Sequence, residues 1–164
     1  MASLFRRILV PHDFSDHAEG ALRLATDLAR DRPGARLRVL HVIPPLTPIA
    51  GLPPAEMGAY IPPADLIAQE RRHLERVVAR VVRGRGAPTI ECQVVIGDPH
   101  HRILEACRGM DAIVMATAGR TGLAHLLIGS VAEKVVRHAS IPVLTVRTEG
   151  RRARRRAARR RTAR

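Results

Sequence analysis

The 164-residue sequence is long enough for about one domain, and its 46% of hydrophobic residues are mostly aliphatic, with only two Phe, one Tyr and no Trp. No apolar run approaches the roughly 18 residues that a membrane span requires, and the apolar run at residues 8–10 is too short for a signal peptide. The formal charge of +13 falls to +4 without residues 151–164, which hold nine arginines and no acidic residue, so the folded body is only mildly basic.

The two cysteines, Cys92 and Cys107, have neither C-x-x-C spacing nor the spacing of a metal site. Sparing use of cysteine favours a reducing compartment, so we expect a cytoplasmic protein. Two small buried thiols are the expected state, and a structural disulfide is the alternative.

Short β-type runs alternate with longer helical patterns along the chain. We expect strands at residues 7–11, 36–43, 90–96, 111–116 and 142–146, and helices from Ser15 to the stop at Pro33-Gly34, over residues 65–83, from Asp98, and over residues 130–138. This alternation predicts an α/β fold: an open doubly wound five-stranded parallel sheet with helices on both faces. Residues 44–63, between the second expected strand and the second expected helix, contain seven prolines, which predicts a long loop.

The helices carry local signals for their starts and their buried faces. Ser15 and Asp98 are suited to cap the helices that follow them, and Pro99 suits a first helical position, where a missing N–H costs nothing. The side chains expected to face the core are Ala18, Ala21, Leu22, Ala25 and Leu28 in the first helix, Ile67, Leu74, Val77, Val78 and Val81 in the second, and Ile103, Leu104 and Cys107 in the third.

Parallel sheets of this kind bind ligands at the carboxyl ends of their strands, here residues 11–13, 41–43 and 115–117. After the last of these ends, a turn with Gly119 leads to Gly129-Ser130 at the start of a helix. Backbone N–H groups at both places can point at an anion, and Arg120 can add a charge-assisted contact to phosphate. The alternative is structural: the glycines serve turn geometry, and Ser130 and Glu133 form a Ser-x-x-Glu capping box.

Several segments together resemble the universal stress protein family. They are the opening at residues 8–15, Gly97-Asp98-Pro99, the glycine segments at residues 119–123 and 127–135, and residues 139–144. The resemblance covers about residues 4–147, with the segments in the family's order. It implies a fold similar to that of the adenine nucleotide alpha hydrolases, in a domain over residues 1–148.

The family's nucleotide-binding pattern is Gly-x2-Gly-x9-Gly-Ser/Thr, and three of its four positions match at Gly119, Gly129 and Ser130. Ala116 replaces the first glycine and adds a methyl group where the backbone would approach ribose and phosphate. The resemblance implies a site for ATP or a related nucleotide, with any Mg²⁺ held through the phosphates. The residues expected at the nucleotide are Pro11, Asp13, Val42, Met115, Ala116, Thr117, Gly119, Arg120, Thr121, Gly129, Ser130 and Val131.

Two of these residues are implied to hold the nucleoside. Asp13 falls where the family holds that part of the ligand, and a carboxylate can accept hydrogen bonds from ribose hydroxyls or an adenine amine. Its alternative role is a turn acceptor near Ser15. Val42 falls at the position whose backbone reads adenine, and its side chain alone would be assigned to the core.

Catalysis has little support in the sequence. His12, His41 and His125 could lie near the pocket, yet no Ser/His/Asp set has informative spacing. Slow ATP hydrolysis is compatible with the family, but no residue stands out as its base. We therefore expect no catalytic residues and no metal ligands.

The function predicted is that of a nucleotide-binding regulatory or stress-response protein. The protein is expected to form a homodimer through its last strand, which lies at a sheet edge by family resemblance. The first alternative function is a dimeric interaction module of the same fold that binds no nucleotide. The second is a polyanion or nucleic-acid binder acting through the arginine-rich tail, residues 149–164, which like-charge repulsion should keep disordered. That tail has no aromatic residue for base stacking, so sequence-specific recognition is not expected.

Overall fold

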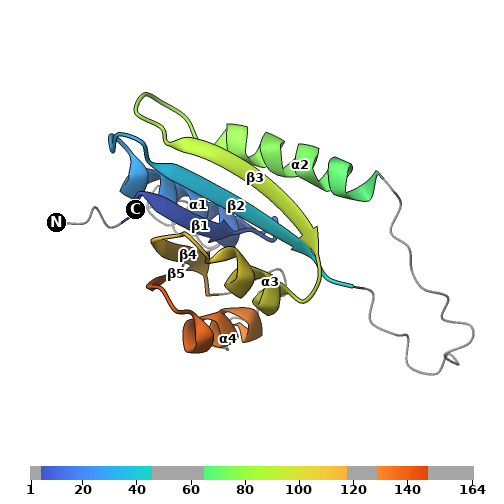
Figure 1. Ribbon diagram of the computed structural model, residues 1–164. Helices are drawn as coiled ribbons and strands as arrows, with labels where there is room; N and C mark the ends of the chain where they lie inside the picture. The colour runs from blue at the N-terminus through green and yellow to red at the C-terminus, as the bar shows by residue number, and fades with distance from the viewer. Residues whose placement is uncertain (1–4, 46–64, 118–128, 148–164) are drawn as a thin grey trace, which may run out of the picture.

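The computed structural model describes residues 5–45, 65–117 and 129–147. Strands and helices alternate through these residues, as the sequence predicts (Figure 1). They are β1 (Arg7–Pro11), α1 (Asp16–Ala29), β2 (Arg36–Ile43), α2 (Leu66–Val81), β3 (Thr89–Ile96), α3 (Pro99–Ala106), β4 (Ala112–Ala116), α4 (Ser130–His138) and β5 (Val143–Val146). No helix among the described residues is both long enough and apolar enough to span a membrane.

The strands form one parallel sheet in the order β3-β2-β1-β4-β5. Chain order therefore runs outward from β1 in one direction and from β4 in the other, so the switch point lies between β1 and β4. Helices cover both faces, and the predicted doubly wound α/β fold is confirmed (Figure 1). Ligands of open parallel sheets bind at the carboxyl ends of the strands beside such a switch point.

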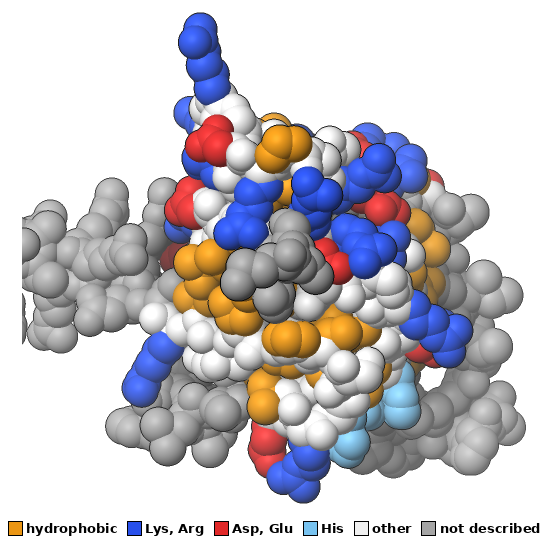
Figure 2. Space-filling view, turned by 60° about the vertical axis from the view of Figure 1, so that its left-hand side comes forward, with side chains coloured by type: hydrophobic (Ala, Val, Ile, Leu, Met, Phe, Trp, Pro, Cys, Tyr) orange, Lys and Arg blue, Asp and Glu red, His pale blue; other side chains and the backbone are white. Residues whose placement is uncertain are grey.

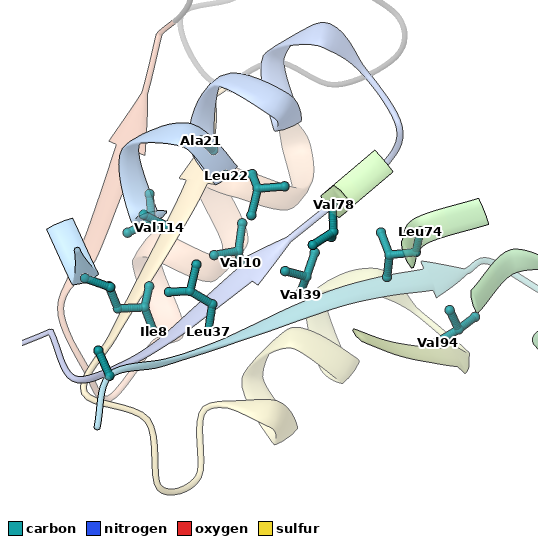
Figure 3. Close-up of a cluster of buried hydrophobic side chains, with 13 residues drawn as sticks. Ile8, Val10, Ala21, Leu22, Leu37, Val39, Leu74, Val78, Val94 and Val114 are labelled. Atoms are coloured by element: carbon teal, nitrogen blue, oxygen red, sulfur yellow. The ribbon is translucent and has the colours of Figure 1, made fainter. Parts of the chain in front are cut away.

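Strand alternation divides the core between the two faces of the sheet. Ile8 and Val10 pack on one face with residues of α1 and α2 such as Leu22 and Leu74 (Figure 3). Leu9, between them in sequence, packs on the other face with residues of α3 and α4. Because both faces of the sheet are buried, the sequence of β1 is apolar without interruption over residues 8–10. Each large side chain that is fully buried there stabilises the fold by about 1.5–3 kcal/mol.

A polar clamp fixes the start of β1 against the turn before β4. The backbone N–H groups of Arg6 and Arg7 donate to Asp111 Oδ2, and the Arg7 guanidinium donates to Oδ1 at 2.8 Å. Partial burial would raise the pKa of Asp111, but the hydrogen bonds and charge of Arg7, with the Arg6 N–H, hold that pKa below its ordinary value. The clamp pins the register in which β1 and β4 meet.

Two predicted helix caps are confirmed. Ser15 Oγ accepts the N–H of Ala18 at 3.1 Å, and Asp98 Oδ1 accepts the N–H groups of His100 and His101 at 3.0 and 3.2 Å. Pro99 occupies the first turn of α3, as expected. These side chains satisfy N–H groups that the helix itself leaves without an acceptor.

The predicted helix over residues 130–138 is confirmed, but one alternative and one prediction about the helices are wrong. Gly129 is the N-cap of α4, so Ser130 lies inside the helix and the alternative role of Ser130, a capping box with Glu133, is excluded. Ile67 is 43% exposed although its spacing matches the apolar face of α2. Leu74, Val77 and Val78 are the buried residues of that helix, because it meets the core with its second half while Ile67 lies in the first turn.

Candidate functional site

A cavity of about 440 Å³ opens at the carboxyl edge of the sheet. The ends of β1, β2 and β4 form its floor, and the first turns of α3 and α4 form part of its wall. Its size falls within the range of roughly 300–1,000 Å³ typical of small-molecule sites. The lining residues are Pro11, His12, Asp13, Ala18, Leu40, His41, Val42, Ile43, Pro44, Glu70, Pro99, Ile103, Met115, Ala116, Thr117, Gly129, Ser130, Val131 and Ala132.

Most of the residues expected at the nucleotide meet in this one cavity. They come from four elements that are distant in sequence: Pro11, Asp13, Val42, Met115, Ala116, Thr117, Gly129, Ser130 and Val131. The other three, Gly119, Arg120 and Thr121, lie outside the described residues. The edge predicted from strand alternation and the cavity therefore coincide.

The first turn of α4 meets the end of β4 through a backbone contact. The N–H of Gly129 donates to the carbonyl oxygen of Thr117 at 2.5 Å, and the N–H of Thr117 donates to Val146 at 3.1 Å. A Cβ atom at position 129 would stand 3.2 Å from the same Thr117 oxygen, which is a tight contact. Glycine at this position lets the start of α4 lie directly against the strand end.

The same glycine leaves the start of α4 without a side-chain cap. Gly129 has no side chain, and among the described residues no side-chain hydrogen bond caps this helix. The first helical hydrogen bond runs from the N–H of Glu133 to the carbonyl oxygen of Gly129. The N–H groups of Ser130 and Val131 come before it and therefore have no acceptor within the helix. Uncapped N–H groups and the helix dipole together suit an anion such as phosphate.

Ala116 differs from the family's glycine, and its packing shows where the extra methyl group lies. Ala116 packs against the core cluster beneath α1, whereas its neighbour Met115 packs on the face covered by α3 and α4. The methyl group therefore occupies the α1 side of β4, and the α4 side next to Gly129 keeps the room it would have with glycine.

Asp13 is held in a fixed position at the end of β1. Its Oδ1 accepts the backbone N–H of Ser15 at 3.1 Å and the Ser15 hydroxyl at 2.6 Å. The turn-acceptor role considered from the sequence is therefore real. The same bonds orient the carboxylate at the cavity lining, so one residue can both close the turn before α1 and face a ligand.

Two buried histidines, His12 and His41, line the cavity, as expected from the sequence, and the third candidate, His125, lies outside the described residues. The backbone N–H of Phe14 donates to His12 Nδ1 at 3.1 Å, so the proton of the neutral His12 ring is on Nε2, which is buried and has no partner among the described residues. His41 Nδ1 donates to the carbonyl oxygen of His12 at 2.8 Å. Burial, the dominant cause, lowers the pKa of His12 to about 4 despite the nearby carboxylates of Asp13 and Glu19.

Sequence reasoning missed an aromatic cluster beside these histidines. The Phe14 ring lies 4.3 Å from the ring of His41 and stacks in parallel on His73 of α2, also at 4.3 Å. Glu70, one turn before His73, lines the cavity. No local sequence pattern predicts this contact, because Phe14 lies in a turn, His41 in a strand and His73 in a helix. The nearest signal is Phe14 itself, one of two phenylalanines in the chain.

An open parallel sheet with a cavity at its switch point and helices on both faces defines a small doubly wound α/β protein. The sequence pattern of the "Universal stress protein family" matches residues 4–147. The chain belongs to that family.

Relatives and solved structures agree with this assignment. A universal stress protein of Methanocaldococcus jannaschii is 33% identical over 147 residues, which cover 88% of this chain and 84% of that protein. The structure of the universal stress protein UspA from Lactobacillus plantarum has a TM-score of 0.66 and 27% identity, over 88% of this chain and 99% of that one. A universal stress protein from Archaeoglobus fulgidus, in complex with dAMP, shares the fold with a TM-score of 0.59 and 24% identity, over 88% and 99% of the two chains.

Proposed function

We propose that this universal stress protein binds an adenine nucleotide, ATP or a close relative, in the carboxyl-edge cavity and acts as a regulatory or stress-response module. The observation that carries the proposal is the uncapped start of α4, where Gly129 lies against Thr117 within the cavity. A phosphate group is the ligand such a helix start suits best. The universal stress protein from Archaeoglobus fulgidus, which shares this fold, has a solved structure in complex with dAMP, and this supports the adenine part of the proposal.

The two ends of the nucleotide would meet different parts of the cavity. The phosphates would accept hydrogen bonds from the N–H groups of residues 130–131, and Gly119, Arg120 and Thr121 would complete that side by family resemblance. Asp13 would accept from ribose hydroxyls or the adenine amine, and the backbone of Val42 would read the base. Mg²⁺, when present, would be held through the phosphates and supply charge neutralisation there.

A matched pair of substitutions on α4 tests this assignment. Ser130→Leu places a branched side chain at the exposed first residue of the helix, whereas Val136→Leu makes a similar change at an exposed residue remote from the cavity. Calorimetric titration with Mg-ATP should show at least about a tenfold loss of affinity, about 1.4 kcal/mol, for Ser130→Leu and no change for Val136→Leu. Equal affinities in both variants would contradict the proposed site.

Homodimerisation through β5 is the second part of the proposal. β5 pairs only with β4 in the described sheet, and three of its four residues are partly buried aliphatic side chains. An aliphatic edge strand is an aggregation hazard unless another chain or element covers it. Light scattering at high micromolar concentration should report a dimer, and a strictly monomeric species would reject this arrangement.

The arginine-rich tail is proposed as a separate polyanion-binding segment. The last strand ends at Val146, which supports a folded domain over residues 1–148 and a tail over residues 149–164. Nine arginines in residues 151–164 favour binding to nucleic acid without sequence preference. We place the protein in the cytoplasm, in keeping with its cysteines, Cys92 and Cys107, which are unpaired.

A further inference from the structure

Three side chains of metal-ligand type meet at the start of α3. Each of Asp98, His100 and His101 offers a ligand atom, and these atoms all lie within 4.8 Å of one another. The rings of His100 and His101 are only 4.0 Å apart between centroids. In the space-filling view, histidine side chains lie exposed next to one another at the lower right edge of the molecule (Figure 2).

Hydrogen bonds fix the orientation of His100. Asp98 Oδ1 and His100 Nδ1 are 2.7 Å apart, and the ionised carboxylate is the acceptor, so Nδ1 carries the proton. The lone pair of the neutral ring is then on Nε2, the atom left for a metal ion. A carboxylate that accepts from one ring nitrogen while the other binds metal is the usual support of a metal-bound histidine. Hydrogen bonds from the His101 and His100 backbone, and from the His100 ring, lower the pKa of Asp98 and keep it ionised.

A third histidine reaches the same place from α4. The ring of His138, the last residue of α4, lies 6.2 Å from the ring of His100. His138 Nδ1 donates to the carbonyl oxygen of Lys134 at 2.8 Å, so its lone pair is also on Nε2. Zn–N bonds of 2.0–2.1 Å let two imidazoles share one ion when their ring centres are roughly 5–6 Å apart. A small movement of His138 would bring it into range.

Local charges do not oppose a cation here. The start of a helix carries partial positive charge, and the Asp98 carboxylate offsets it. The neighbouring arginines are engaged elsewhere: Arg102 donates to Ile96 O and to Glu105, and Arg137 donates to Glu133. Capping α3 explains Asp98, but it requires neither His100 nor His101, and it leaves His138 unexplained.

We propose that His100, His101 and His138 form a site for a divalent transition-metal ion of the Zn²⁺ type, with Asp98 orienting His100 through its Nδ1 proton. Three imidazoles, one of them supported by a carboxylate, are the donor chemistry that such borderline ions prefer over Mg²⁺ or Ca²⁺. The ion would tie the start of α3 to the end of α4. Pro99, which lies between Asp98 and His100 in the chain, lines the cavity, so the bound metal would stabilise that part of the cavity wall.

Calorimetric titration of the tag-free full-length chain with ZnCl₂ tests the proposal. We expect one ion per chain, and a rise in melting temperature with zinc that EDTA reverses. His100→Ala/His101→Ala should lose binding by at least about a hundredfold, and His138→Ala and Asp98→Asn by about tenfold each. Asn still caps a helix, so Asp98→Asn removes the charge while keeping the fold.

A matched control lies at the start of α1, where Asp16 and His17 also begin a helix. Asp16→Asn/His17→Ala should leave zinc affinity unchanged, and thermal melts in EDTA should show that every variant is folded. Any of three results would overturn the proposal. These are no zinc binding at 100 µM, unchanged affinity in the His100→Ala/His101→Ala or His138→Ala variants, or loss of binding in Cys92→Ser/Cys107→Ser instead.

Discussion

At the wall that β1 and β2 form, polar side chains bond to other groups of the same chain: Asp13 to Ser15, His12 to Phe14, and His41 to the His12 carbonyl oxygen. At the wall that α4 forms, the helix begins at Gly129 without a side-chain cap. The first wall is fixed before any ligand arrives, whereas the second leaves backbone donors for the ligand to satisfy. We call the β1 and β2 side the fixed wall and the α4 side the open wall. In the proposed function the nucleoside lies against the fixed wall and the phosphates lie against the open wall.

The start of α3 differs from the start of α4 in the same way, because it borders the same cavity but is capped by a side chain. Asp98 accepts two backbone N–H groups there, and Pro99 supplies no N–H at all. The helix starts of α1, α3 and α4 all contribute to the cavity lining, and among the described residues only that of α4 lacks a side-chain cap. The substitutions below each change one wall or one helix start of the cavity and leave the remaining parts of the cavity unchanged.

The largest expected effect is a decrease in the free energy of unfolding at acidic pH, caused by His12 in the fixed wall. Its pKa is about 4 in the fold against an ordinary value of 6.5, so the unfolded chain takes up the proton first as pH falls. The free energy of unfolding should therefore be unaffected by His12 above pH 6.5 and should decrease between pH 6.5 and 4, by at most about 3 kcal/mol.

His12→Asn is the matched variant, because the amide oxygen of Asn can replace Nδ1 as the acceptor for Phe14 and does not titrate. Urea denaturation at pH 7, 5.5 and 4.5 should give a shallower pH dependence for this variant than for the parent protein. Identical pH dependence would mean that His12 is not a neutral buried group. Asp98 and Asp111 do not blur the result, since their lowered pKa values confine their effects to pH below about 4.

Placing a carboxylate on the open wall should remove its affinity for anions. In Gly129→Asp the side chain would cap α4 and repel phosphate, so Mg-ATP affinity should fall by tenfold or more while the melting temperature holds or rises. Gly129→Ala is the control for the added Cβ, which meets Thr117 O at 3.2 Å, and should lose less affinity than the Asp variant. A Gly129→Asp protein that binds ATP like the parent would show that the phosphates lie elsewhere.

Removing the cap of α3 should have the opposite signature. Asp98→Ala should lower the urea concentration at the unfolding midpoint, because two N–H groups lose their acceptor. Its Mg-ATP affinity should stay within about twofold of the parent when both are measured in the absence of transition metals. A large loss of ATP affinity with no change in stability would mean that α3, and not α4, holds the phosphates.

The smallest effect on either wall should come from truncation after Glu149. ATP affinity and melting temperature should be nearly unchanged, whereas binding to duplex DNA should disappear. For the full chain, the slope of log K against log salt concentration should be about −5, from about −0.9 per phosphate neutralised and partial engagement of the nine arginines. A truncated protein that binds DNA as well as the full chain would rule out the tail as the binding segment.

The sequence predicts best those features that depend on neighbours along the chain. Ser15 and Asp98 cap their helices as expected, because a cap bonds to N–H groups two or three residues away. The strand ends could be assigned to the cavity because parallel strands bring their carboxyl ends to one edge. The predicted bounds of α4, residues 130–138, are also confirmed, but its cap is Gly129 and not Ser130, since both residue types are common at N-cap positions.

Features that join distant elements could not be predicted in this way. The packing of Phe14 between His41 and His73 depends on the register of β1 with β2 and on where α2 crosses the sheet. Ile67 has the spacing of a buried residue, but spacing does not say where a helix leaves the core. The approach of His138 to His100 likewise depends on how α4 lies against α3.

The most direct test of the open wall is to follow backbone amide resonances while titrating the protein with Mg-ATP and, separately, with adenosine. The account predicts that the amides of Ser130 and Val131 shift with ATP and stay nearly unchanged with adenosine, whereas residues around Asp13 and Val42 shift with both. If ATP at saturation left Ser130 and Val131 unshifted, or if adenosine moved them as far, the start of α4 would not be the phosphate site.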